Sequence, residues 1–320
     1  MNVDTLNPFV PTASLGAAMA VRRSCHLVAG WPLASLPALR SMRPSGFLQA
    51  WLVAACDAKA CVTDPVALAE SCIAFCLVRP PGHHASRSSC DGYCFVNNAV
   101  LAAQTLAAAG HRVAVIDFDV HHGNGTQSIF YERADVLCVS MHMNQGAWDE
   151  GTSHPETGGA DEVGAGAGVG FNVNVPLDYG YGDAAYAAAF EALVVPEVDA
   201  FRPTAIVVAC GVDGSQMDPN GRQLLTQRGF FKLGRACRLM ADKHADGRIV
   251  ITQEGGYSLS YTAFCVHAVL EARALGTAGT LISRLTCRCA SRRALLATRS
   301  RCWMTRWLAR IPTRRCAIPP

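Results

Sequence analysis

Four polar clusters in this sequence each follow a short apolar run, and their side chains are of types that can perform chemistry. The clusters begin at Arg79, Asp117, Gly211 and Gln253, and the runs before them have the length and β-branched content of buried strands. In an open parallel sheet, ligands bind beyond the carboxyl ends of the strands. Segments that are distant in the sequence are therefore expected to converge at one edge of a sheet.

The cluster Asp117-Phe-Asp-Val-His-His-Gly-Asn124 is the most informative of the four. Side chains alternate along an extended strand, so Asp117, Asp119 and His121 share one side. Asp213 from a neighbouring strand completes three protein ligands and leaves positions open for water and substrate. Imidazole with carboxylates suits Zn²⁺, and Fe²⁺ or Co²⁺ are alternatives. Each acid taken alone is better explained as a loop or helix cap, but the whole set predicts a metal site.

Two further groups of residues could handle protons near that site. His83 and His84 follow a Pro-Pro-Gly turn, and paired histidines suit general acid–base catalysis near neutral pH. His122 is expected to point away from the metal site and to have a packing or supporting role. Tyr257 follows two glycines and can bring its hydroxyl to a polarised carbonyl oxygen, although a buried structural tyrosine explains it equally well.

The elements that position these residues can be read from hydrophobic patterning over residues 72–275. Strand-length apolar runs alternate with helix-like segments, which favours a mostly parallel sheet flanked by helices, in a single α/β domain. The active site is expected at the C-terminal ends of the strands. A glycine-rich stretch at 158–170 precedes a strand, so it is interpreted as a flexible connection and not as a phosphate-binding loop. The expected strands are 73–78, 113–116, 136–140, 171–175, 205–210 and 249–252, and the expected helices are 97–109, 183–200, 229–245 and 260–272.

The composition is that of a globular chain. Of 320 residues, 50% are hydrophobic and 17% are charged, which excludes disordered, collagen-like and coiled-coil classes. No apolar run reaches the roughly 18–20 residues of a spanning helix, so we expect no membrane partner. The first residues do not have the pattern of a secretory signal. We therefore expect a cytoplasmic protein whose fifteen cysteines are reduced.

Charge is unevenly distributed along the chain. Residues 281–320 contain ten arginines and neither lysine nor acid, which leaves 18 basic and 25 acidic residues elsewhere. This tail could be a nucleic-acid-binding arm. However, it has four cysteines, two tryptophans and no helical or strand period, so a nucleic-acid partner is not expected. We expect residues 276–320 to be poorly ordered and residues 1–71 to be a truncated or misframed segment, and we hypothesise out-of-frame translation or a misjoined gene at one or both ends.

Residues 72–275 resemble the histone deacetylase and acetylpolyamine amidohydrolase superfamily, in its class II-like, bacterial-type branch. Several long motifs occur in the right order. The resemblance implies an arginase/deacetylase-like fold and a zinc-dependent amidohydrolase. The matching segments are Arg79-Pro-Pro-Gly-His-His-Ala85, Gly92-Tyr-Cys-Phe-Val-Asn-Asn98, Asp117-Phe-Asp-Val-His-His-Gly-Asn-Gly-Thr-Gln127, Gly211-Val-Asp213 and Glu254-Gly-Gly-Tyr257.

The resemblance also implies a role for each catalytic residue. The zinc ligands would be Asp119, His121 and Asp213. His83 and His84 would form the dyad that handles the proton of water and the leaving amine. Asp117 would orient His83, Asn124 would orient His84, and Tyr257 would donate to the developing oxyanion.

Residues of a substrate channel and of a second cation site follow from the same resemblance. Gly92 and Tyr93 would form one wall of an acyl-lysine channel. His154-Pro155 would form the opposite wall, where Phe-Pro or Tyr-Pro is usual, and would make this channel more polar. A structural potassium ion would be held by backbone oxygens around Asp117, Asp119 and His121 and by Ser140.

The sequence therefore predicts a deacetylase that acts on linear amides, with acetyl-lysine or a short-chain acylated amine such as acetylpolyamine as substrate. An alternative is a catalytically impaired remnant that binds metal but lacks a complete channel. A manganese ureohydrolase would need further carboxylates around Asp213, which residues 211–215 do not supply. The identity of the natural substrate and the existence of a homo-oligomer stay open at this point.

Overall fold

The computed structural model describes residues 73–144 and 154–274. The predicted N-terminal segment 1–71 and the arginine-rich tail 276–320 lie outside the described residues. No described helix is both long enough and apolar enough to cross a bilayer. Within the described ranges, no two cysteines form a disulfide.

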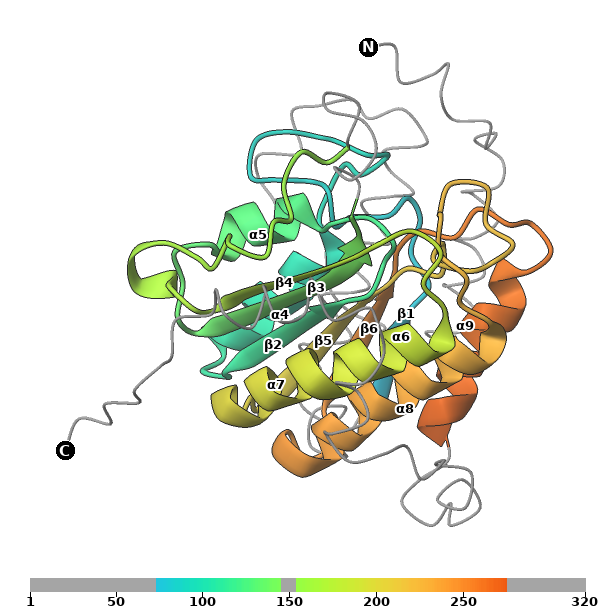
Figure 1. Ribbon diagram of the computed structural model, residues 1–320. Coiled ribbons are helices and arrows are strands. Elements are labelled where there is room, and N and C mark those ends of the chain that lie inside the picture. The colour runs from blue at the N-terminus through green and yellow to red at the C-terminus, as the bar shows by residue number, and fades with distance from the viewer. Residues whose placement is uncertain (1–72, 145–153, 275–320) are drawn as a thin grey trace, which may run out of the picture. The chain divides into compact units, whose positions relative to one another are not determined.

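Six parallel strands form the sheet of the described chain, in the order β1-β6-β5-β2-β3-β4 (Figure 1). This confirms the predicted α/β class. The strands are β1 (Ile73–Cys76), β2 (Val113–Asp117), β3 (Val136–Met143), β4 (Asn172–Leu177), β5 (Ala205–Cys210) and β6 (Ile249–Gln253).

The strand order changes direction between β2 and β5. From β2 the chain proceeds outward to β3 and β4, whereas from β5 it proceeds to β6 on the other side. Connections that leave two neighbouring strands in opposite directions open a crevice at their carboxyl ends, and ligands bind there in open α/β sheets. The residues that follow Asp117 in β2 and Cys210 in β5 therefore flank this crevice.

Helices cover both faces of the sheet (Figure 1). Helix α4 packs on one face, where Val100 and Leu106 share a buried core with Val113, Val115 and other strand residues. Helices α6, α7 and α8 lie together on the other face (Figure 1). The helices are α4 (Asn98–Ala108), α5 (Asn124–Phe130), α6 (Asp183–Ala189), α7 (Val195–Phe201), α8 (Gln227–His244) and α9 (Thr262–Ala274), and a π-helical turn (Phe190–Val194) joins α6 to α7.

The predicted elements are present, with changes at their ends. β1 ends at Cys76 instead of residue 78, and β3 continues from residue 140 to Met143. The sequence did not predict α5, because its Asn-Gly start is typical of a turn. The glycine-rich connection contains only one 3₁₀ turn, Gly166–Gly168, before β4.

Candidate metal centre

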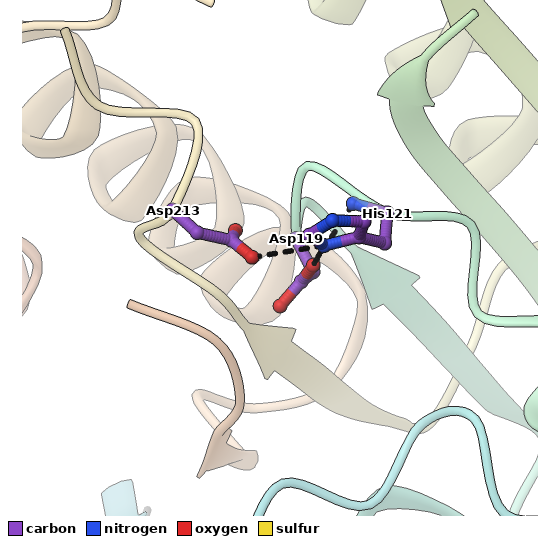
Figure 2. Close-up of side chains that lie close together, drawn as sticks. All are labelled: Asp119, His121 and Asp213. Carbon is purple, nitrogen blue, oxygen red and sulfur yellow. Dashed lines mark hydrogen bonds and ion pairs between the residues drawn. The ribbon is translucent and has the colours of Figure 1, made fainter. Parts of the chain in front are cut away.

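Three side chains meet just beyond the carboxyl ends of β2 and β5 (Figure 2). The Nδ1 atom of His121 lies 3.2 Å from Asp119 Oδ1 and 3.0 Å from Asp213 Oδ2. One ligand atom of each residue lies within 4.8 Å of the other two. Within the described ranges, these three residues form the group of His, Cys, Asp or Glu side chains that could hold a metal ion. We call Asp119, His121 and Asp213 the acidic cluster.

Backbone groups hold both carboxylates in place. The Val120 amide donates to Asp213 Oδ1 at 2.9 Å, and the Gly255 amide donates to Asp119 Oδ2 at 2.8 Å. A Cβ atom at Gly255 would lie 2.3 Å from Asp213 Oδ2 and 2.7 Å from Asp119 Oδ2, so a larger residue would fill the space beside the carboxylates. The glycine thus lets the segment after β6 approach the two carboxylates closely.

The electrostatics of the acidic cluster favour a cation. The pKa of Asp213 is raised to about 7, first by burial and then by the charge of Asp119. Burial alone would lower the pKa of His121, but hydrogen bonds and charges from Asp119 and Asp213 raise it to about 10. Two buried carboxylates thus require a compensating positive charge, which a proton on His121 or a divalent cation can supply. This donor set of two carboxylates and one imidazole fits Zn²⁺ or Fe²⁺.

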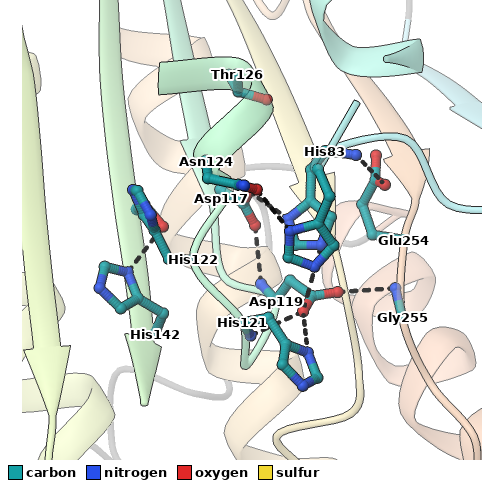
Figure 3. A network of polar contacts seen from close by, with 12 residues as sticks. His83, Asp117, Asp119, His121, His122, Asn124, Thr126, His142, Glu254 and Gly255 are labelled. Carbon is teal, nitrogen blue, oxygen red and sulfur yellow. Dashed lines mark hydrogen bonds and ion pairs between the residues drawn. The ribbon is translucent and has the colours of Figure 1, made fainter. Parts of the chain in front are cut away.

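A pair of neighbouring histidines, with ring planes tilted by 45°, lies beside the cluster. The rings of His83 and His84 are buried and their centroids are 4.0 Å apart. His83 Nδ1 contacts Asp117 Oδ2 at 2.9 Å, and His84 Nδ1 contacts Asn124 Oδ1 at 2.7 Å (Figure 3 labels His83, Asp117 and Asn124). His83 Nε2 is 3.7 Å from Asp119 Oδ1, which brings the pair next to the acidic cluster.

The two histidines differ in proton affinity. Burial opposes charge on His83, but the carboxylates of Asp119 and Asp117 raise its pKa well above the usual value. Burial and the neighbouring charge of His83 lower the pKa of His84 well below the usual value. The pair therefore combines one imidazole that retains its proton with one that is neutral. Such separated pKa values are typical of acid–base pairs in active sites.

Glu254 holds the turn that carries the histidine pair, a role that its motif alone did not reveal. Its Oε2 atom accepts hydrogen bonds from the Gly82 amide at 2.6 Å and from the His83 amide at 3.1 Å. Thr252 donates to its Oε1 atom at 2.8 Å. Burial raises the pKa of Glu254 to about 7. The available signal was its place immediately after β6, at the same sheet edge as the other clusters.

The residues predicted for the channel and the oxyanion lie near the pair. The Tyr257 and Tyr93 rings have centroids 5.9 Å apart, and the Tyr257 amide donates to Asp218 Oδ2 at 2.7 Å. Burial, followed by the charges of Asp213 and Asp119, raises the pKa of Tyr257 well above its usual value, which keeps its hydroxyl protonated. The His154 ring lies 5.1 Å from the His84 ring.

Gly92 and Tyr93 form the two central residues of a tight hairpin. Their φ angles are +48° and +68°, and Asp91 and Cys94 exchange backbone hydrogen bonds of 3.2 and 2.7 Å on either side. A two-residue turn with both φ angles positive is the type I′ geometry. At Gly92 a Cβ atom would lie 2.2 Å from His84 Cδ2, so the hairpin packs directly against the histidine pair.

His122 points away from the acidic cluster, as strand alternation predicts, and joins a different set of polar groups. It contacts Thr157 Oγ1 at 2.9 Å and Gln127 Oε1 at 3.1 Å, and burial lowers its pKa to about 4. The His142 ring lies 4.7 Å away (Figure 3). We call His122, Gln127, His142, Asn172 and Asn174 the neutral network, which the Glu162 carboxylate borders through a hydrogen bond from Gln127 Nε2.

Ser140, the residue predicted for a potassium site, lies at the margin of this network. Its hydroxyl contacts His142 Nδ1 at 2.9 Å, and it pairs in register with Asp117 of β2. His142 Nε2 donates to the Gly158 carbonyl at 3.0 Å, which leaves its Nδ1 to accept from Ser140. The neutral network thus connects β3 to the glycine-rich connection.

Similarity to known proteins was found over most of the described chain. The family model described as "Histone deacetylase domain" matches residues 40–273. Histone deacetylase 8 of Arabidopsis thaliana is 51% identical over 201 residues, which are 62% of this chain and 53% of that protein. A histone deacetylase-like amidohydrolase of Pseudomonas aeruginosa is 44% identical over 211 residues, which are 65% of this chain and 54% of that protein. This chain thus spans about half the length of these relatives.

The fold is also similar to that of a solved structure. The crystal structure of an acetylpolyamine aminohydrolase from Burkholderia pseudomallei superposes with a TM-score of 0.63 at 37% sequence identity. The match covers 71% of this chain and 63% of the other.

Proposed function

Because the chain belongs to the histone deacetylase family, we propose that it is a zinc-dependent amidohydrolase that removes acetyl or similar short acyl groups from amines. Acetyl-lysine and acetylpolyamine are the substrate classes that we propose. The observation that supports this most is the position of the acidic cluster beyond the carboxyl ends of β2 and β5, directly beside the histidine pair. Metal ligands and proton-transfer groups are thus within reach of one substrate.

Asp119, His121 and Asp213 would hold the ion. Zinc bound there would polarise the amide carbonyl of the substrate and activate a water molecule for attack at neutral pH. Asp119 and Asp213 are already fixed by backbone donors, so little ordering is needed when the ion binds.

The histidine pair would transfer the proton. The neutral His84 ring accepts a proton as water adds to the amide carbon, and Asn124 holds that ring through Nδ1. As the carbon–nitrogen bond breaks, the same proton passes to the departing amine. Asp117 holds His83 in its charged form beside the reaction. Water and amide are thereby converted to a carboxylic acid and an amine.

Tyr257 would stabilise the oxyanion that develops on the substrate. Its raised pKa keeps the hydroxyl as a donor, and such donors strengthen as charge forms on the oxygen. Tyr93 and His154 would contact the acyl-amine chain at the entrance. A structural potassium ion near Ser140, with backbone oxygens around Asp117, Asp119 and His121, is part of the same proposal.

The proposal is tested on the purified full chain with zinc analysis and two fluorogenic assays, one for acetyl-lysine and one for acetylpolyamine. We expect one zinc ion per chain, turnover that is lost on chelation, and recovery when zinc is added back. One bound zinc ion without turnover would support the alternative of an impaired remnant. A chain that binds no zinc and turns over neither substrate would refute the proposal.

A further inference from the structure

Asp91 lies at the centre of three hydrogen bonds that no catalytic role yet explains. Its carboxylate accepts from the Gly92 amide at 2.9 Å, from Asn124 Nδ2 at 3.2 Å and from His154 Nε2 at 2.8 Å. The residue is half-buried and occupies the first position of the tight hairpin beside the histidine pair. Its backbone position is thus set by the hairpin, and its side chain is directed at Asn124.

These contacts determine which way the Asn124 amide faces. An amide can present either its oxygen or its NH₂ group to a neighbour, but an ionised carboxylate only accepts hydrogen bonds. Asp91 therefore requires the NH₂ group of Asn124 and leaves Oδ1 for His84. Burial alone would raise the pKa of Asp91, but hydrogen bonds from His154 and Asn124 lower it, so the carboxylate is ionised at neutral pH.

The direction of the Asn124 amide in turn determines the tautomer of His84. Because Asn124 Oδ1 only accepts, the His84 Nδ1 atom at 2.7 Å must carry the ring proton. The unprotonated nitrogen of the neutral ring is then Nε2. A flipped Asn124 amide would donate a hydrogen bond to His84 Nδ1, and the ring proton would then lie on Nε2. With Nε2 protonated, that atom could not accept a proton from water.

We propose that Asp91 is a positioning residue that fixes the His84 tautomer through Asn124, with His154 securing the Asp91 carboxylate. This inference rests on the proposed function, because it concerns a histidine that we assign to proton transfer. It gives His154 a second role beyond the channel wall. The chain of contacts joins three segments, residues 91, 124 and 154, that surround His84.

A positioning role of the Asp91 side chain can be separated from a structural role, because the hairpin is held by backbone hydrogen bonds. The backbone hydrogen bonds between Asp91 and Cys94 do not use the Asp91 side chain, so Asp91→Asn should keep the hairpin. The new amide, however, can donate to Asn124 and thereby permits the flipped orientation. Asp246→Asn is a matched control, because this exposed carboxylate pairs with Arg248 just before β6, at the opposite end of the strand from the site.

The test is ¹⁵N NMR of the histidine rings in the labelled full chain, with and without zinc, and His84 is assigned from the signals missing in His84→Gln. We expect one His84 tautomer, protonated at Nδ1, in the wild-type chain and in Asp246→Asn. Asp91→Asn should show loss of that single tautomer. In the assay, its kcat should fall by about 10–10²-fold with a KM changed less than about twofold.

A second variant keeps the test independent of any loss of stability. In Asn124→Asp combined with Asp91→Asn, a carboxylate faces His84 whichever way its side chain turns, and the amide at position 91 donates to it, so Nδ1 of His84 remains protonated. Adding Asp91→Asn to Asn124→Asp should therefore leave the tautomer unchanged. Asp91→Asn with the wild-type tautomer, or an equal change in both backgrounds, would overturn the proposal. The predicted tautomer pattern in a chain without turnover would uphold the role of Asp91 and refute the proposed function instead.

Discussion

His121 and His122 are neighbours in the chain, yet they face two polar regions with opposite electrostatics. His121 contacts two buried carboxylates, which raise its pKa to about 10. His122 contacts a hydroxyl and an amide, and burial lowers its pKa to about 4. One ring therefore attracts a positive charge and the other excludes it.

The residue type alone therefore does not decide the role of a buried polar side chain. The acidic cluster has more negative charge than its own groups neutralise, so it favours a bound cation. In the neutral network, uncharged groups pair with one another: Asn172 and Asn174 donate to Gln127 Oε1 at 2.7 and 2.8 Å, and Gln127 Nε2 donates to the Glu162 carboxylate at the edge of the network. A network paired in this way stabilises the fold and leaves little capacity for a ligand.

The largest effect is expected from Asp213→Asn, which removes one charge from the acidic cluster. Zinc affinity should fall by more than about 10²-fold, since even residues behind the ligands typically contribute 10–100-fold. Turnover should fall to the level of the chelated wild type. Competition with a chromogenic chelator measures the affinity, and Asp246→Asn is the control. Unchanged zinc binding would mean that the cluster is not the metal site.

Tyr257→Phe separates oxyanion stabilisation from metal binding. Removing one such donor typically lowers turnover by about 10²–10³-fold, while the acidic cluster is untouched. We therefore expect a folded variant with a full complement of zinc and little activity. Turnover like that of the wild type would show that the proposed role of Tyr257 is wrong.

His122→Asn tests the neutral network through the pH dependence of stability. His122 has a pKa of about 4 in the folded chain, compared with a reference value of 6.5. The unfolded chain therefore binds a proton in this window that the folded chain does not, and stability is lost as pH falls from 6.5 towards 4.

The contribution of His122 between pH 7 and pH 5 is about 2 kcal/mol. From pH 7 to pH 5, the free energy of unfolding should therefore fall by about 2 kcal/mol more in the wild type than in His122→Asn. At pH 7 the variant should be less stable than the wild type. Urea denaturation at the two pH values measures both quantities. Equal pH dependence in the two proteins would contradict the low pKa of His122.

The sequence predicted the sheet well because continuous β-branched runs such as 205–210 leave few alternatives to a buried parallel strand. It placed the end of β3 too early because Ser140 and His142 are polar residues that the neutral network buries. A strand can contain such residues only where distant partners satisfy them. Local patterning does not contain that information.

The same limit applies to the candidate site. The sequence predicted which segments would converge, because strand ends in a parallel sheet share one edge. It did not predict that Glu254 would hold the Gly82 and His83 amides, or that Asp91 would contact Asn124 and His154. These pairs lie far apart in the chain and depend on side-chain directions in packed loops.

Because the chain leaves β2 and β5 in opposite directions, two different sets of segments surround the site. One set supplies the acidic cluster, and the other supplies residues around the histidine pair. Asp119, His121 and Asp213 come from the segments that follow β2 and β5, whereas Asp91, Tyr93 and His154 come from loops that supply no residue of the cluster. Exchange of those loops should therefore leave the three side chains of the acidic cluster in place, but it would remove the contacts that Asp91 and His154 make around Asn124 and His84.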